Sequence, residues 1–204
     1  MIGPVLLRNN LIMPALNDHD RELIERDTAL PGLRCVLDPV RLMHEFGDDP
    51  VGQQAISRLE DFRLDYVRYK PGINCLGRYA FTLDGQPHQA YVKTFGPNGA
   101  RKLSKFAELA GAPGPFGPAR LVLPDAGLLF SFFPNDAKLP SIARLGDIAH
   151  RRHLVGRIFK QDDTWQSSHY SVLNYKPERR LVCRFERLWL PGCLGSGEAD
   201  HARG

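Results

Sequence analysis

The clearest pattern of apolar and polar residues lies in the middle of the chain. Residues 62–70 alternate with a period of two, and residues 74–83 and 89–95 continue as two further strand-like stretches. A period of two is typical of a β-strand with one buried face. The dipeptides Pro71-Gly72 and Asp84-Gly85 separate the three stretches, and both favour tight turns. The pattern therefore predicts three consecutive antiparallel strands.

The period changes after the third strand. Apolar residues spaced by three and four predict a helix over residues 98–110, and the Gly- and Pro-rich stretch 111–118 ends it. Residues 120–123 and 128–133 are expected to form two more strands. This order of elements predicts an α+β fold, in which an antiparallel sheet of about five strands carries one packed helix.

The flanking regions are less regular. Asp38 is a good N-cap and Pro39 suits the first turn of a helix that stops near Gly47. Earlier in the chain, helical periodicity appears only at residues 19–27. Residues 141–159 have a helical period that Gly146-Asp147 divides, with Asp147 as the expected cap of the second part.

The chain is therefore expected to contain four regions. Residues 1–60 form a helical or irregular region, and residues 61–140 form the α+β unit. Residues 141–190 contain the divided helix and a second hairpin. Residues 191–204 are rich in Gly and charged residues without periodicity, and we expect them to be disordered.

One segment of the chain occurs twice. Residues 69–79 read Tyr-Lys-Pro-Gly-Ile-Asn-Cys-Leu-Gly-Arg-Tyr, and residues 175–185 read Tyr-Lys-Pro-Glu-Arg-Arg-Leu-Val-Cys-Arg-Phe. The copies align without a gap at an offset of 106 residues. A repeat at a fixed offset indicates a duplicated structural unit, and the turn residues predict that this unit is a β-hairpin.

Charge is distributed unevenly. Residues 1–140 carry 16 basic and 16 acidic side chains, whereas residues 141–204 carry 11 and 7. Part of the excess lies in the second repeat, at Lys176, Arg179 and Arg180. Such a cluster can bind phosphate-rich partners such as nucleic acid. The alternative is a solvated basic surface with no ligand.

Cysteine and histidine spacing gives no metal site. The four cysteines are far apart and form no Cys-x-x-Cys pair, which favours a reduced, cytoplasmic protein without a metal or redox centre. His150 and His153 are three residues apart on an expected helix, and we interpret them as a surface pair. No apolar run approaches the roughly 20 residues of a membrane span, so no membrane association is expected.

The order of elements and the repeated hairpin resemble a known family. Tyr-Lys-Pro followed by an apolar strand and Arg-Tyr or Arg-Phe is similar to the first hairpin of bacterial aminoglycoside/choline phosphotransferase-like proteins, which have a protein-kinase-like fold. Residues 132–140 are similar to the segment after the last small-lobe strand in that family. The resemblance covers roughly residues 60–188. It implies the N-terminal small-lobe region only, in which the first hairpin is an accessory subdomain and the second begins the nucleotide-binding lobe.

The resemblance also implies site residues. Lys93 lies on the third strand, where the family's lysine reaches the phosphates of ATP, and Glu108 lies on the following helix, where a glutamate holds that lysine. We therefore expect these two side chains within about 4 Å of each other. Pro71-Gly72 and Gly77 are the nearest equivalents of the glycine-rich loop, and Lys70 and Gly72 are expected to join Lys93 and Glu108 in nucleotide binding. A complete family member would use ATP and magnesium. The alternative is an edge-strand lysine and a solvent-facing glutamate.

Several family motifs do not occur in this sequence. Neither hairpin has Gly-x-Gly-x-x-Gly spacing, and there is no His-Gly-Asp motif with a following Asn and no Asp-Phe-Gly motif. We therefore predict no catalytic or metal-binding residue. The expected protein is a truncated or stand-alone small lobe without kinase activity by itself, whose partners are a nucleotide or a missing catalytic lobe. The alternative is a non-catalytic module that binds nucleic acid through its basic hairpins.

Overall fold

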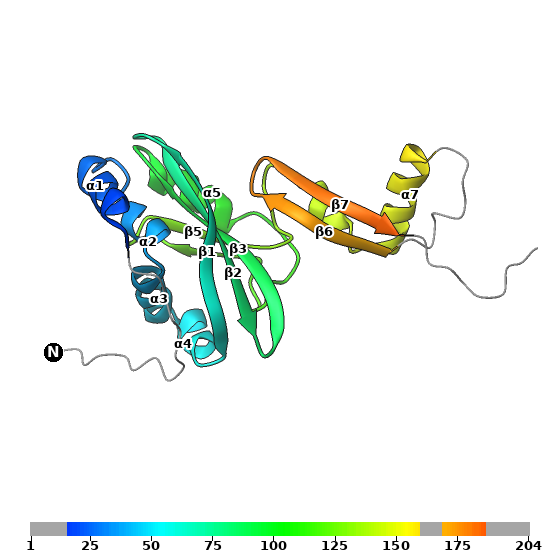
Figure 1. Cartoon of the computed structure of the whole chain (residues 1–204), viewed down its shortest axis with the longest axis horizontal. Helices are drawn as coiled ribbons and strands as arrows, with labels where there is room; N and C mark the ends of the chain where they lie inside the picture. Colours follow the sequence, from blue (N-terminus) through cyan, green and yellow to red (C-terminus); the bar gives the residue numbers. More distant parts are fainter. Residues whose placement is uncertain (1–15, 160–168, 187–204) are drawn as a thin grey trace, which may run out of the picture. The chain divides into compact units, whose positions relative to one another are not determined.

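The computed structural model describes residues 16–159 and 169–186. These residues belong to two compact units (Figure 1). The first unit contains the described residues up to Ala143 together with the short segment Lys176–Arg180. The second contains Arg144–Tyr175 and the residues from Leu181 onwards, as far as the structure describes them. The expected disorder of residues 191–204 concerns positions outside the described residues.

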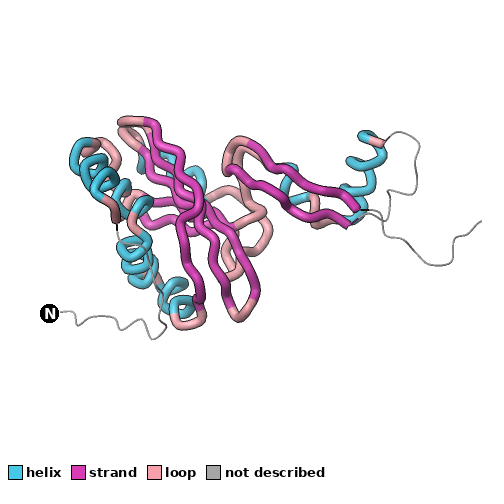
Figure 2. The backbone as a smooth tube through the Cα atoms, in the orientation of Figure 1, coloured by secondary structure: helices cyan, strands magenta, loops and turns pink. Residues whose placement is uncertain are grey.

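The first unit is built on a five-stranded antiparallel sheet with the strand order β1-β2-β3-β5-β4. Figure 2 shows the strands in magenta. This arrangement confirms the predicted fold class. The strands are β1 (Leu59–Lys70), β2 (Asn74–Leu83), β3 (Gln86–Phe95), β4 (Arg120–Leu123) and β5 (Leu128–Phe132). The first strand starts three residues before the predicted alternation. Asp84 and Gly85 both have positive φ in the turn between β2 and β3, as their sequence predicts.

Four helices cover one face of this sheet (Figure 1). They are α1 (Asp18–Arg26), α2 (Leu33–Leu37), α3 (Pro39–Asp48) and α4 (Pro50–Ile56). The predicted start of α3 is confirmed, because Asp38 Oδ1 accepts hydrogen bonds from the backbone N–H groups of Val40 and Arg41. Helices α2 and α4 were not predicted from the sequence. α4 nevertheless begins with the same Asp-Pro signature as α3, in which the cap Asp49 precedes Pro50.

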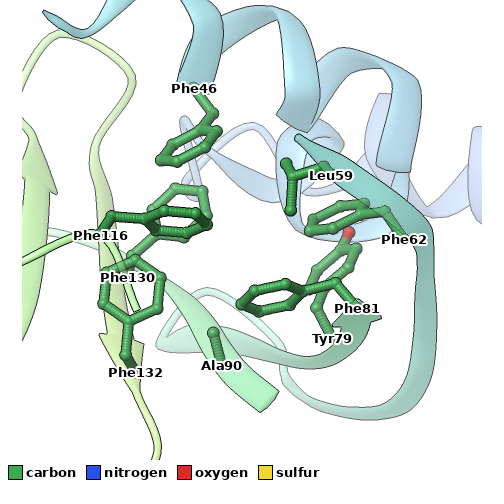
Figure 3. Close-up of a pocket in the computed structure, with 9 residues that line it drawn as sticks. All are labelled: Phe46, Leu59, Phe62, Tyr79, Phe81, Ala90, Phe116, Phe130 and Phe132. Atoms are coloured by element: carbon green, nitrogen blue, oxygen red, sulfur yellow. The ribbon is translucent and has the colours of Figure 1, made fainter. Parts of the chain in front are cut away.

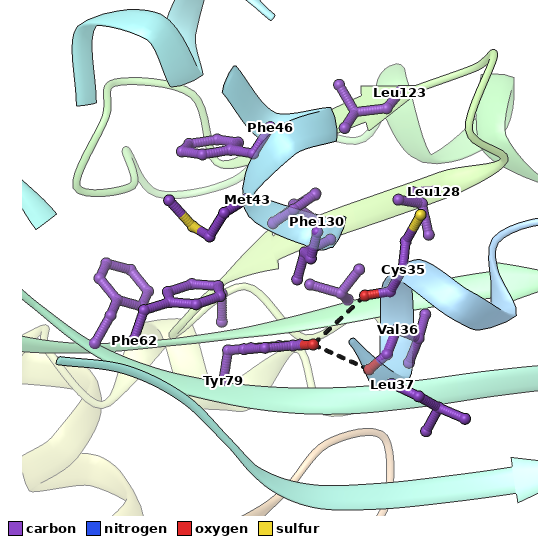
Figure 4. Packing of buried hydrophobic residues seen from close by; sticks show 14 of the residues in the cluster. Cys35, Val36, Leu37, Met43, Phe46, Phe62, Tyr79, Leu123, Leu128 and Phe130 are labelled. Carbon is purple, nitrogen blue, oxygen red and sulfur yellow. Dashed lines mark hydrogen bonds between the residues drawn. The ribbon is translucent and has the colours of Figure 1, made fainter. Parts of the chain in front are cut away.

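An aromatic core lies between the helices and the sheet. Tyr79 is fully buried, and its hydroxyl group donates a hydrogen bond to the carbonyl of Val36 at 3.0 Å, which joins β2 to α2 (Figure 4). Phe116, from the Gly- and Pro-rich loop, stacks on Phe81 with ring centroids 5.8 Å apart. The cavity that these rings line has a volume of only about 10 Å³ and exclusively apolar walls (Figure 3). This core is closely packed and offers no room for a ligand.

A smaller cluster lies on the opposite face of the sheet. Helix α5 (Gly99–Ala107) contacts β3, β4 and β5, and it buries Leu103 in this cluster. The rings of Phe95 and Phe106 stack with centroids 5.8 Å apart. This helix was predicted, and it covers only part of its face.

The second unit contains helical and hairpin segments of its own. α7 (Ile148–Ile158) belongs to this unit, and Asp147 caps it as predicted, whereas the preceding α6 (Ser141–Arg144) lies mostly in the first unit. β6 (His169–Lys176) and β7 (Arg180–Glu186) form the second hairpin. The ring centroids of Tyr170 and Phe185 in this hairpin lie 6.3 Å apart. Among the described helices of the chain, none combines the length and apolar character needed to cross a bilayer.

The Tyr79 hydroxyl group provides a test of how the helical layer is attached. We expect Tyr79→Phe to lower the free energy of unfolding by about 1–3 kcal/mol, because the Val36 carbonyl loses its partner in the core. Urea unfolding followed by circular dichroism measures the change. The same substitution at the half-buried Tyr66 should change stability by less than about 0.5 kcal/mol. Equal losses at both positions would contradict the proposed attachment.

Candidate functional site

Two cationic side chains project from the α5 face of the sheet. Arg68 on β1 lies opposite Leu76 on β2, and Leu76 lies opposite Lys93 on β3. Residues that face each other on neighbouring strands project from the same face. The strand register therefore places Arg68 and Lys93 in one row across the sheet, beside the region that α5 covers.

Lys93 is buried because its strand is central. β3 lies between β2 and β5, and only 6% of the Lys93 side chain is exposed. Its ammonium group lies 4.8 Å from the centroid of the Phe95 ring. A buried ammonium group is costly to desolvate unless an anion accompanies it.

The anion is Glu178, which lies in the turn of the second repeat. Its Oε1 is 2.6 Å from Lys93 Nζ, and its Oε2 is 2.6 Å from Arg68 Nη2 and 3.4 Å from Lys138 Nζ. Only 1% of the Glu178 side chain is exposed. One carboxylate thus contacts three cationic groups from β1, β3 and the segment after β5. Residues 176–180 belong to the first unit, so this arrangement lies within that unit.

The backbone of the same turn is also held in place. The Glu178 N–H group donates a hydrogen bond to Asp136 Oδ2 at 2.7 Å, and Asp136 is itself buried. The other oxygen of Asp136 accepts hydrogen bonds from the backbone N–H groups of Lys138 and Leu139. We call residues 176–179 the Glu178 turn, and we call Arg68, Lys93, Asp136, Lys138 and Glu178 the Glu178 cluster.

The first repeat contains the same type of turn without the carboxylate. The two turns comprise residues 70–73 and 176–179. In each, the N–H group of the fourth residue donates a hydrogen bond to the carbonyl of the first at 3.0 Å. The third residue has a left-handed backbone in both, with φ of +62° at Gly72 and +58° at Glu178. Each third residue also donates its N–H group to an aspartate, which is Asp27 for Gly72 at 2.8 Å. The repeated motif is therefore a turn anchored on an aspartate, and the second copy adds an anionic side chain.

The cluster shifts the pKa of both partners of the buried ion pair. Burial by itself raises the pKa of Glu178, but the hydrogen bond and charge of Lys93, together with Lys138 and Arg68, outweigh burial and lower this pKa below 4.5. Burial lowers the pKa of Lys93 below 10.5, and the nearby cations Lys138 and Arg68 add to this, while Glu178 opposes them. The cluster contains three cationic groups and two carboxylates.

The expected ion pair between Lys93 and Glu108 is wrong. Glu108 is the exposed C-cap of α5, and Lys93 pairs with Glu178. The reason is the helical period. Leu103 faces the sheet, and a residue five positions later lies about 140° around the helix axis. Glu108 therefore points away from the face that carries Lys93.

The other predicted residues have separate locations. Lys70 is exposed, and Gly72 lies in the turn anchored by Asp27. In the second repeat, Lys176 lies with its ammonium group 5.8 Å from the ring centroid of Tyr66. Arg179 and Arg180 are exposed. None of these residues belongs to the Glu178 cluster as defined above.

Sequence reasoning missed Arg68, Asp136, Lys138 and Glu178. One signal was available for Glu178. The first copy has Gly72 at the left-handed position of the turn, where glycine is favoured. A glutamate at the equivalent position is an unusual choice, and the repeat alignment exposes it. Nothing in the local sequence indicates the contact with Lys93, 85 residues away.

Metal and thiol chemistry find little support in the described part of the chain. No group of three or more His, Cys, Asp and Glu residues there could hold a metal ion. Cys35, Cys75 and Cys183 are free thiols, and burial raises the pKa of Cys75 to about 12.

Comparison of the chain with protein-family models, curated proteins and solved structures found no match.

The buried ion pair predicts a pH-dependent stability. We expect Glu178→Gln to lower the free energy of unfolding by about 3 kcal/mol at pH 7, because Lys93 is left without its counter-charge. The pKa of Glu178 is lowered in the folded state, so its stabilising contribution is present above the unfolded value near 4.5. It is lost as the pH falls through the lowered folded value.

The measurement is urea unfolding of both proteins between pH 7 and pH 3. The stability difference between wild type and Glu178→Gln should shrink as the pH falls below 4.5. Glu60→Gln removes an exposed carboxylate from β1 and serves as the control, with little effect at any pH. A difference that does not change with pH would show that Glu178 is not ionised in the folded protein.

Proposed function

We propose that this chain is a nucleotide-binding small lobe of the aminoglycoside/choline phosphotransferase-like kind, without phosphoryl-transfer activity of its own. The observation that carries the proposal is the buried lysine on the third strand of the sheet, paired with a carboxylate. The element order supports the comparison, because three antiparallel strands precede the helix and two strands follow it. Topology alone does not imply function, so the argument rests on the chemistry of the Glu178 cluster.

The chemistry of the cluster suits a phosphate group. Arg68 offers a planar guanidinium group and Lys93 a compact ammonium group, and both bind phosphate oxygens well. Both project from strands of the sheet, and both are paired with the Glu178 carboxylate in the structure. Lys138 adds a third cation that is 62% exposed and free to reach a larger ligand.

The segment after β5 supports the same assignment. Residues 132–140 are the part of the chain that resembles the family's segment after the last small-lobe strand, and they supply Asp136 and Lys138 to the cluster. Asn135 fixes this segment, because its side chain bonds both the N–H group and the carbonyl of Ala112, at 2.8 and 2.9 Å. Two residues of this segment, Asp136 and Lys138, therefore lie in the same cluster as Lys93.

Phosphoryl transfer requires groups that this sequence does not present in the family's motifs. A positioned aspartate that accepts the proton of the acceptor hydroxyl and carboxylate or amide ligands for magnesium supply much of the catalysis. We propose that a separate catalytic lobe would have to provide the base and the magnesium ligands. In that arrangement the present chain contributes the phosphate-binding lysine.

Nucleotide binding is tested by thermal unfolding with ATP or ADP, with and without magnesium. We expect each nucleotide to raise the Tm of the wild type, since a ligand at 100 times its Kd stabilises by about 2.7 kcal/mol. Lys93→Met should abolish the rise, whereas Lys105→Met, at an exposed position of α5, should keep it. No rise for the wild type at millimolar nucleotide, or an equal rise in Lys93→Met, would contradict the proposal.

An RNA-binding measurement distinguishes the nucleotide-binding function from the nucleic-acid-binding alternative. Arg179, the last residue of the Glu178 turn, and Arg180, which follows it, are exposed and could contact a polyanion. Binding of single-stranded RNA that weakens steeply with salt and is lost in the double variant Arg179→Ala/Arg180→Ala would favour the nucleic-acid function. Nucleotide binding that depends on Lys93 would favour the small lobe.

Activity provides a second test. We expect no ATP hydrolysis or phosphoryl transfer above background when the isolated chain is incubated with radiolabelled ATP, magnesium and sugars, choline or aminoglycosides as acceptors. The physical reason is that the sequence has neither the His-Gly-Asp motif nor the Asp-Phe-Gly motif that supply the base and the metal ligands in the family. Turnover that disappears in Lys93→Met would contradict the proposal and reveal a complete active site.

A further inference from the structure

Glu178 occupies the cationic site in the way that a bound anion would. Its two oxygens lie 2.6 Å from Lys93 Nζ and 2.6 Å from Arg68 Nη2, which are the distances of charge-assisted hydrogen bonds. The carboxylate comes from a turn, so it reaches the site as the tip of a hairpin rather than as part of the sheet. Two of the cationic residues, Arg68 and Lys93, lie on strands of the sheet.

The cluster has more hydrogen-bond donors than one carboxylate can use. Arg68 Nε is buried and has no hydrogen-bond partner among the described residues. Lys93 has three ammonium protons, and the structure describes one hydrogen bond from them, to Glu178. A phosphate group presents three or four oxygens and up to two negative charges, whereas a carboxylate presents two oxygens and one charge. The site therefore matches a phosphate better than it matches its present occupant.

The turn that delivers Glu178 has an unfavourable backbone. Glu178 has φ of +58°, a left-handed conformation that residues with a Cβ seldom adopt. Gly72 holds the same position in the first copy, where it adopts this conformation without steric cost. Release of the turn would relieve this strain, which offsets part of the favourable contact with the cations.

We infer that the Glu178 turn is a displaceable internal anion, and that a phosphate group of a phosphoester or diphosphate ligand takes the place of the Glu178 carboxylate on Arg68, Lys93 and Lys138. The turn then leaves Asp136, and the Glu178 N–H group loses its hydrogen bond. This inference rests on the proposed function, because the ligand uses the same lysine. Beyond that function, we infer that the Glu178 carboxylate of the second repeat fills the site when no ligand is bound.

Closure by an internal anion lowers the apparent affinity for phosphate. A ligand that binds only the open form is weakened in proportion to the fraction of open molecules. Minor conformations of this kind are commonly populated at about 0.1–10%. Removal of the carboxylate should therefore raise the affinity by at least about tenfold.

The affinity is measured by isothermal titration calorimetry with inorganic pyrophosphate and with ADP. Glu178→Gln keeps the shape of the side chain, and Glu178→Gly restores the residue of the first copy and removes the backbone strain. Both variants should bind pyrophosphate at least about tenfold more tightly than the wild type. Glu60→Gln makes the same change in net charge at an exposed site and should bind like the wild type. Equal affinity in all four proteins would overturn the inference.

Hydrogen exchange tests the displacement in the unaltered protein. The Glu178 amide donates to a buried carboxylate without ligand, so its exchange should be slow. Saturation with pyrophosphate should accelerate exchange at residues 176–179 by at least about tenfold, and the Gly72 amide, bound to Asp27, should not change. Unchanged or slower exchange at Glu178 in the saturated protein would overturn the inference.

The two ligands separate this inference from the proposed function. Pyrophosphate binding that accelerates exchange, without ADP binding, supports the displaceable turn and refutes the nucleotide function. ADP binding that depends on Lys93 but leaves the Glu178 amide protected supports the nucleotide function and refutes the displacement. Failure of both ligands to bind Glu178→Gly, in which the carboxylate is gone, refutes both.

Discussion

A buried ammonium group requires an anion, and this requirement organises the candidate site. Lys93 lies on the central strand of the sheet with 6% of its side chain exposed, and its counter-charge comes from Glu178, 85 residues later. The same carboxylate contacts Arg68 and Lys138, and the backbone of its turn is bound by Asp136. The Glu178 turn is thus held within the first unit by the ion pairs of its carboxylate and by a hydrogen bond from its backbone.

The repeat gives this interaction its particular form. In both copies, the residue that follows Tyr-Lys-Pro donates its N–H group to an aspartate, which is Asp27 in the first copy and Asp136 in the second. In the first copy this residue is Gly72, and the turn carries no charge toward a ligand site. In the second copy Glu178 projects a carboxylate from the same position. At this position the first copy therefore has an uncharged turn residue, whereas the second copy presents a carboxylate to Lys93 and Arg68.

The sequence was sufficient for the elements that have a strong local signal. The sheet followed from the alternation of residues 62–70 and from the turn residues that bound the other strand-like stretches, and α3 and α7 followed from Asp38 and Asp147 as caps. The pairing of Lys93 could not be derived in this way, because a contact between residues 85 positions apart leaves no local pattern. The kinase comparison indicated Glu108 instead, and the period of α5 turns that residue away from the sheet. Short helices such as α2 have too few residues to show a period.

A double-mutant cycle on Lys93 and Glu178 tests the central claim most directly. The free energies of unfolding of the wild type, Lys93→Met, Glu178→Gln and the double variant are compared at pH 7. Residues in direct contact couple by about 0.5–3 kcal/mol, whereas independent sites add within about 0.3–0.5 kcal/mol. The account predicts a coupling above about 1 kcal/mol, with the double variant less destabilised than the sum of the single variants. Additive effects would show that the two side chains do not form the buried ion pair on which the site depends.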